Sequence, residues 1–84
     1  MPRYYRHIRH EGQVIQDPEG IDLPDFEAAR AEAIQEIRDI LAEAVRSGAD
    51  DMVDDALVLT DEAGQVLTII PFIEALPPWM RRTT

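Results

Sequence analysis

The sequence has 84 residues, which is enough for one domain and too few for a large enzyme with an enclosed substrate cavity. It contains no cysteine, and all eight basic residues are arginine, so thiolate zinc sites and cysteine or lysine nucleophiles are excluded. No apolar run approaches the roughly 20 residues of a membrane span, and the first residues lack the apolar core of a secretion signal. We therefore expect a cytoplasmic protein without a membrane segment.

The charge is divided unevenly along the chain. Residues 1–10 contain three arginines and no acid, whereas residues 11–62 contain 16 acids against three arginines, within a net charge of −9. An acidic body of this kind argues against tight non-specific DNA binding, because neutralisation of phosphates dominates that affinity.

The first third of the chain predicts a β-hairpin. Residues 4–9 are rich in aromatic and β-compatible side chains, and the chain resumes as a strand at 13–16 after a turn at His10-Glu11-Gly12. The hairpin is ended by Asp17-Pro18-Glu19-Gly20, in which the proline suits the second position of a turn.

A long amphipathic helix is predicted next. Asp25 is suited to be its N-cap, the helix is expected to run to about Arg46, and Ser47-Gly48 is suited to end it. At about 100° per residue the apolar side chains share one core-facing stripe: Ala29, Ala33, Ile37, Ile40, Leu41 and Ala44, with Ile34 and Val45 at its edge. The acids gather on one side, which we call the acidic flank: Glu32, Glu36, Asp39 and Glu43. Arg30 falls inside the stripe, where we expect its guanidinium to reach a carboxylate or a carbonyl.

The remainder predicts a second hairpin and a tail. Residues 49–55 contain four aspartates without the pattern of a calcium loop, and we interpret them as an exposed acidic loop. Strands are expected at 56–60 and 65–70 around the turn 61–64, followed by one helical turn at 72–76. Residues 77–84 are expected to be an irregular tail, because Pro77-Pro78 disfavours a helix.

This order predicts an α+β domain over residues 1–76. The expected architecture is a two-layer β-β-α-β-β fold, in which one long helix packs on one face of a four-stranded, mainly antiparallel sheet. The second hairpin is apolar on both faces, and one helix can cover only one of them. The other face must meet the tail, a second protomer or another protein. A homodimer is the simplest solution, with Leu67 and Ile69 as candidate interface residues.

Several short strings carry a resemblance to a known family. They are Pro2-Arg3-Tyr4-Tyr5 with His7, the turn 17–20, Leu23-Pro24-Asp25-Phe26-Glu27-Ala28-Ala29-Arg30-Ala31-Glu32-Ala33, Thr60-Asp61-Glu62-Ala63-Gly64 and Pro71-Phe72. Over residues 2 to about 76 the chain resembles an uncharacterised family of short bacterial domains of unknown function. That resemblance implies a fold and no catalytic residue. Arg6 stands where the family more often has an aromatic or aliphatic residue.

A looser similarity of pattern connects the chain to HicB-like antitoxins. It rests on the predicted hairpin, on Leu23-Pro24-Asp25 at the start of the helix and on the alanine-rich helix itself. This resemblance implies a partner that is a small, basic, RNA-cleaving toxin.

The sequence offers little for catalysis, and we expect no enzyme, cofactor or metal site. Ser47 is the only serine and has no histidine near it in sequence. His7 and His10 are three residues apart, which places them on opposite faces of a strand. We expect both to be exposed or hydrogen-bonded.

The leading hypothesis is a non-enzymatic protein-interaction module that acts as an adaptor or an antitoxin-like protein. Its acidic flank would bind a basic protein partner. The alternative is a nucleic-acid binder that uses Arg3, Arg6 and Arg9 with the aromatic residues of the first strand. In the opposing interpretation these arginines pair with the acidic flank of the same chain or of a neighbouring one.

Overall fold

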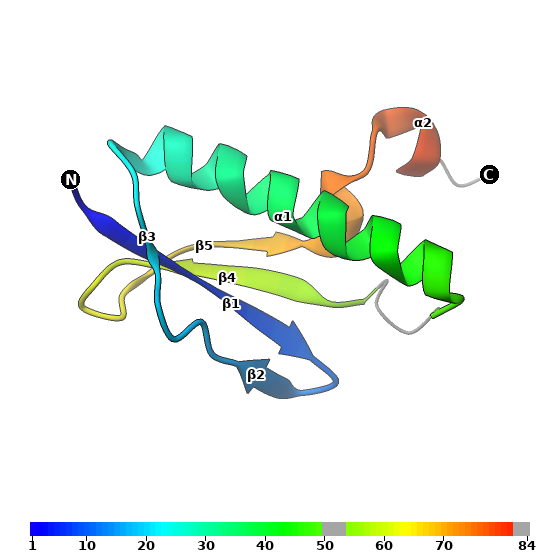
Figure 1. Ribbon diagram of the computed structural model, residues 1–84, viewed down its shortest axis with the longest axis horizontal. Helices are drawn as coiled ribbons and strands as arrows, with labels where there is room; N and C mark the ends of the chain where they lie inside the picture. Colours follow the sequence, from blue (N-terminus) through cyan, green and yellow to red (C-terminus); the bar gives the residue numbers. More distant parts are fainter. Residues whose placement is uncertain (50–53, 82–84) are drawn as a thin grey trace.

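The structure is a computed structural model that describes residues 1–49 and 54–81. One long helix lies across one face of an antiparallel sheet, and a short helix follows near the C-terminus (Figure 1). In chain order the elements are β1 (Arg3–His10), β2 (Gln13–Ile15), β3 (Ile21–Asp22), α1 (Phe26–Ser47), β4 (Ala56–Thr60), β5 (Val66–Pro71), the 3-10 helix η1 (Phe72–Ala75) and α2 (Pro78–Arg81). The expected two-layer α+β architecture is confirmed.

The sheet has the order β2-β1-β4-β5, and β3 pairs with the start of β1. All pairs are antiparallel. The two-residue strand β3 is an addition to the four strands expected. It forms because Gly20, with a φ of 71°, turns the chain back so that Tyr4 pairs with Ile21.

Helix α1 begins and ends where its capping residues predict. The Asp25 carboxylate accepts a hydrogen bond from Ala28 N at 2.9 Å. At the other end Gly48 adopts a left-handed φ of 83°, and the N–H of Ala49 donates to Ala44 O at 2.9 Å. This is the arrangement in which glycine terminates a helix without a steric cost.

The core lies between α1, β4 and η1. Residues paired across antiparallel strands share a face, so Leu57 with Ile8 and Leu59 with Arg6 face α1. The largest fully buried side chains are Phe72, Ile37, Leu57 and Leu59. Phe72 belongs to η1, so this turn is part of the core.

The expectation of an irregular tail from residue 77 is wrong for its first part. Pro78 begins the four-residue helix α2, and Met80 N donates to Pro77 O at 2.9 Å. Proline is tolerated in the first turn of a helix, where its missing N–H would have had no intrahelical partner. The pair Pro77-Pro78 therefore starts a helical turn here. Residues 82–84 lie outside the described part of the chain.

Candidate functional site

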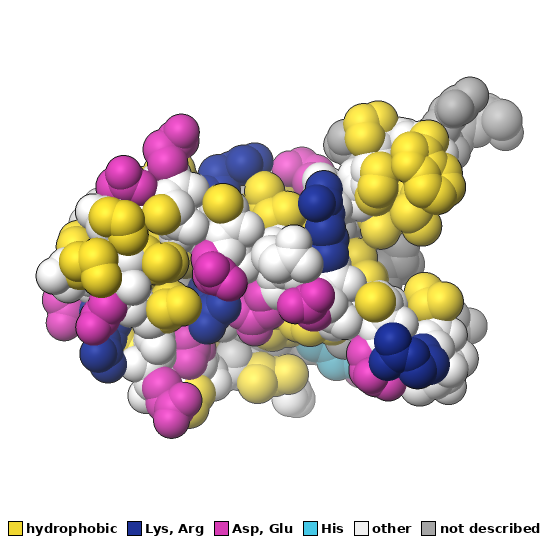
Figure 2. All heavy atoms as spheres, turned by 45° about the horizontal axis from the view of Figure 1, so that its top comes forward, with side chains coloured by type: hydrophobic (Ala, Val, Ile, Leu, Met, Phe, Trp, Pro, Cys, Tyr) yellow, Lys and Arg dark blue, Asp and Glu magenta, His cyan; other side chains and the backbone are white. Residues whose placement is uncertain are grey.

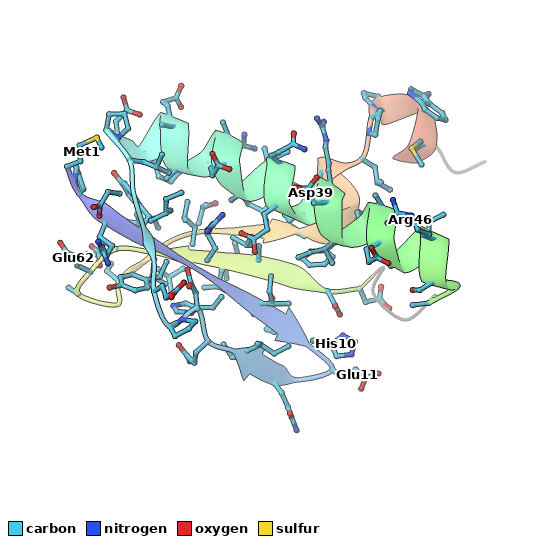
Figure 3. All side chains as sticks on the ribbon, viewed as in Figure 1. Met1, His10, Glu11, Asp39, Arg46 and Glu62 are labelled. Atoms are coloured by element: carbon cyan, nitrogen blue, oxygen red, sulfur yellow. The ribbon has the colours of Figure 1, made fainter. Side chains whose placement is uncertain are left out.

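The acidic flank of α1 borders a groove. Glu32, Asp39 and Glu43 are exposed, whereas Glu36 is partly buried. The groove has a volume of about 420 Å³; Glu36, Asp39 and Glu43 line it together with the apolar side chains of Ile40 and Ala44. We call it the acidic groove. Figure 3 shows Asp39 and Arg46 on α1, and His10 and Glu11 at the tip of the first hairpin.

The carboxylates of the acidic groove differ in how far they are already engaged. Glu43 Oε1 accepts from Arg46 Nη1 at 2.8 Å, and Asp39 Oδ1 accepts from Gln35 Nε2 at 3.2 Å. Both contacts lie at the exposed surface of one helix, where ion pairs and hydrogen bonds contribute little. Asp39 and Glu43 therefore remain available to another molecule.

Glu36 is held by the first strand. Its Oε1 lies 2.6 Å from Arg6 Nη1, and the two side chains are 32% and 20% exposed. Burial raises the pKa of Glu36, although the Arg6 guanidinium opposes the shift. Neither Glu36 Oε1 nor Arg6 Nε has a hydrogen-bond partner of good geometry in the described structure. The pair therefore links α1 to β1 through charge, with incomplete hydrogen bonding.

The three arginines of β1 do not form one basic surface. Arg3 makes two hydrogen bonds to the Asp22 carboxylate, at 2.9 and 3.2 Å, and Arg6 points to the opposite face toward Glu36. Arg9 is exposed, and no carboxylate of residues 1–49 or 54–81 pairs with it. Pairing with the acidic flank is thus confirmed for Arg6, while Arg3 has a different acidic partner.

On the open face of the sheet, Asp17 and His7 form a compact polar network. The Asp17 carboxylate accepts from the backbone N–H groups of Arg6, Glu19 and Gly20 at 3.1 to 3.2 Å. Burial raises the pKa of Asp17, but these three bonds outweigh it and leave the pKa below its usual value. Asp17 N donates to His7 Nδ1 at 3.0 Å, so this nitrogen acts as the acceptor of the bond.

His10 lies on the other side of β1 and contacts Asp55. Its Nδ1 is 2.7 and 2.8 Å from the two carboxylate oxygens, and the Asp55 side chain is 2% exposed. The expectation of an exposed acidic loop is therefore wrong at Asp55, which the fold buries against His10. Asp54 is exposed, and residues 50–53 lie outside the described residues. Both histidines are hydrogen-bonded, on opposite faces, as expected.

The two apolar candidates of the second hairpin are separated by the fold. Leu67 is partly buried and packs against the core, whereas Ile69 is 43% exposed on the face away from α1. A register shift between Leu59 and Thr60 changes the alternation at this point of the hairpin. Ile69, with the exposed Val66, stays a candidate interface residue, and Leu67 belongs to the margin of the core.

Sequence reasoning missed a second groove, on the opposite flank of α1. It has a volume of about 220 Å³ and lies between the second half of α1 and the segment that leads into α2; its apolar lining includes Leu41, Val45, Leu76, Pro77 and Met80. We call it the apolar groove. The available signal was the string Pro77-Pro78-Trp79-Met80, which places large apolar side chains in a segment assigned to a tail.

On α1 it is the side chain of Arg38 that donates to a backbone carbonyl, whereas the prediction named Arg30. Arg38 Nε donates to Ala75 O at 2.6 Å and so joins α1 to η1. Arg30 is exposed, and in the part of the chain that the structure describes its side chain has no ion pair or hydrogen bond. The prediction for Arg30 was therefore wrong, because the segment that receives an arginine lies farther along the helix.

The described residues contain no cluster of three or more histidine, aspartate or glutamate side chains that could hold a metal ion. No helix among them is both long and apolar enough to cross a membrane. What the molecule presents is a set of surfaces: an acidic groove, an apolar groove and an open sheet face.

A two-layer α+β domain with one helix on an antiparallel sheet is the class that this fold defines. Residues 3–73 match the model of the family described as a domain of unknown function (DUF6894). The chain belongs to this family, which confirms the resemblance to an uncharacterised family of short domains. No curated protein and no solved structure matched the chain. The similarity to HicB-like antitoxins has no support among these comparisons.

Proposed function

We propose that this domain is a cytoplasmic, non-enzymatic protein-interaction module that binds a basic partner through the acidic groove, as an adaptor or an antitoxin-like protein does. The observation that carries the proposal is the combination in this groove of exposed carboxylates with apolar surface. Asp39 and Glu43 stand beside Ile40 and Ala44 around a volume of about 420 Å³. An arginine or lysine side chain fits such a surface, because its stem is apolar and its head is charged.

Charge supports the same choice of partner. The chain has a net charge of −9, so its long-range field attracts basic molecules and repels acidic ones. Such a field mainly raises the rate of association, and salt screens it over about 8 Å at physiological ionic strength.

The test neutralises the two exposed carboxylates that line the acidic groove. We expect the double variant Asp39→Asn and Glu43→Gln to fold normally, because exposed charges contribute little to stability. Affinity capture from the source cell, followed by association kinetics with the purified partner, should show a slower on-rate at low salt. The difference should fade as the salt concentration rises.

A matched control removes two charges elsewhere. Glu62 and Glu74 are exposed and lie outside the acidic groove, so the variant Glu62→Gln and Glu74→Gln has the same net charge as the test variant. It should retain most of the wild-type on-rate. A partner whose binding ignores the Asp39 and Glu43 substitutions at every salt concentration would contradict the proposal.

The alternative, a nucleic-acid binder, has one observation in its favour. The rings of Tyr5 and His7 are stacked on the open face, with centroids 6.2 Å apart and planes 10° apart. Against it, Arg3 and Arg6 are engaged by Asp22 and Glu36, which leaves Arg9 for phosphates. Salt-sensitive binding of single-stranded RNA that Arg9→Ala weakens would restore this alternative.

A further inference from the structure

The apolar groove on α1 is surrounded by exposed apolar side chains. Val45 is 78% exposed, and α2 carries Trp79 at 70% and Met80 at 49%. Met80 lines the groove, whereas Trp79, which precedes it in the sequence, is not part of the described lining. Figure 2 shows the hydrophobic side chains of this region as a cluster over α2. Tryptophan is enriched among the residues that contribute most to the affinity of protein–protein interfaces.

The groove is held in place by the core on one side and by α1 on the other. Phe72 and Ala75 of η1 are fully buried, and Arg38 Nε donates to Ala75 O at 2.6 Å. The chain then runs through Leu76 and Pro77, which line the groove, into α2. The part of the groove formed by Leu76 and Pro77 directly follows this buried turn, so it should lose little conformational entropy on binding.

The charge around the groove limits what can occupy it. Arg38 is the charged residue of its described lining, and no carboxylate is part of that lining. Two copies of a chain with a net charge of −9 repel each other over most of their surfaces. Here they can meet without bringing the acidic flanks together, because those carboxylates belong to the other side of α1.

We propose that a second copy of this chain binds the apolar groove, so that Trp79 of each protomer enters the groove of the other around a two-fold axis. A two-fold contact uses the same surface on both copies, and each copy offers both a protruding aromatic side chain and a groove. This places the homodimer contact on α1 and α2, whereas the sequence pattern placed it on the second hairpin. The proposal does not depend on the basic partner of the acidic groove.

The test is sedimentation equilibrium of the full chain, with the fluorescence of Trp79 followed during dilution. Trp79 is the single tryptophan of the sequence, so its emission reports on this surface alone. We expect the wild type to be dimeric at high concentration and its emission to shift to the red as dilution dissociates it. Trp79→Ala and Val45→Glu should each weaken the dimer at least tenfold, roughly the effect of losing one interface hot spot.

Two control variants make the outcome specific. Ile69→Glu places a charge on the open sheet face and should leave the dimer intact, as should Asp39→Asn with Glu43→Gln in the acidic groove. Circular dichroism would verify folding, which we expect to be retained because Val45 and Trp79 are exposed. A wild type that stays monomeric at high concentration would overturn the proposal. So would a dimer that Ile69→Glu dissociates and Trp79→Ala leaves unchanged.

Discussion

The two flanks of α1 belong to the same helix and offer opposite surfaces. On one flank Asp39 and Glu43 border a groove of about 420 Å³; on the other, Leu41 and Val45 border one of about 220 Å³. The first is the surface on which we propose that a basic partner binds. The second carries no carboxylate in its described lining and is the surface on which we propose that a second copy binds. The two surfaces are distinct because residues at different positions of the helical period lie on different sides of the helix.

The neighbours of each flank explain the difference. The acidic flank faces β1, which supplies Arg6 to Glu36. The apolar flank faces η1 and the start of α2, which Arg38 joins to α1 through Ala75 O. Each flank therefore has one arginine link, but one link is an ion pair to the sheet and the other a hydrogen bond to a backbone carbonyl.

The largest effect is expected from breaking the link of the acidic flank. Arg6→Leu leaves the partly buried Glu36 without its cation and should lower the free energy of unfolding by about 2 kcal/mol. This is less than the 3–5 kcal/mol for a fully buried pair, because both side chains keep some contact with water. Urea denaturation measures the difference.

The double variant Arg6→Leu with Glu36→Leu is the matched comparison. It replaces both charged groups by apolar ones on the face that already holds Leu59, so it should recover most of the lost stability. If the double variant were as unstable as Arg6→Leu, the role given to the unpaired Glu36 carboxylate would be wrong.

A smaller effect is expected on the apolar flank. Arg38→Met removes the hydrogen bond to Ala75 O and should cost about 1 kcal/mol of stability. It should also weaken the proposed dimer, because the segment that leads to α2 is held less firmly. Arg30→Met is the control, since Arg30 is an exposed arginine of the same helix. Equal effects of the two substitutions on denaturation and sedimentation would show that the Ala75 contact has no such role.

The smallest effect is a pH dependence at Glu36. Because burial raises its pKa in the folded state above the ordinary 4.5, the native protein takes up this proton at a higher pH than the unfolded chain does. Between the two pKa values Glu36 therefore adds stability as the pH falls. Unfolding curves at several pH values should show this contribution in the wild type and lack it in Glu36→Gln. If the free energy of unfolding changed with pH in the same way in both proteins, the raised pKa given to Glu36 would be contradicted.

Much of the fold was predictable because its signals are local. Asp25 and Gly48 act at the ends of α1 through hydrogen bonds to residues within four positions, so the helix could be placed from the sequence. β3 could not be placed, because two residues form a strand only when Tyr4 and Arg3 lie beside them. The helix α2 was not predicted, because proline was taken to exclude a helix, although proline is tolerated at the first position of one.

The candidate sites were less predictable than the fold. Helical periodicity alone predicted the acidic flank, but the partly buried position of Glu36 depends on β1 passing below it. The burial of Asp55 depends on His10, which is 45 residues away in the chain. The apolar groove required the position of η1 and α2 against α1. Local periodicity contains none of these distances.

Asp17 has a consequence for aggregation. Strand β1 is paired with β3 at Arg3 and Tyr4 and with β2 from Ile8 to His10, and between these stretches the Asp17 carboxylate accepts the N–H of Arg6. The Asp17 carboxylate thus occupies a backbone N–H group of β1 that could otherwise hydrogen-bond to a strand of another molecule. Unprotected strand edges are where sheets of different molecules join into larger assemblies. Asp17, in the turn that follows β2, therefore protects the unpaired stretch of this sheet edge.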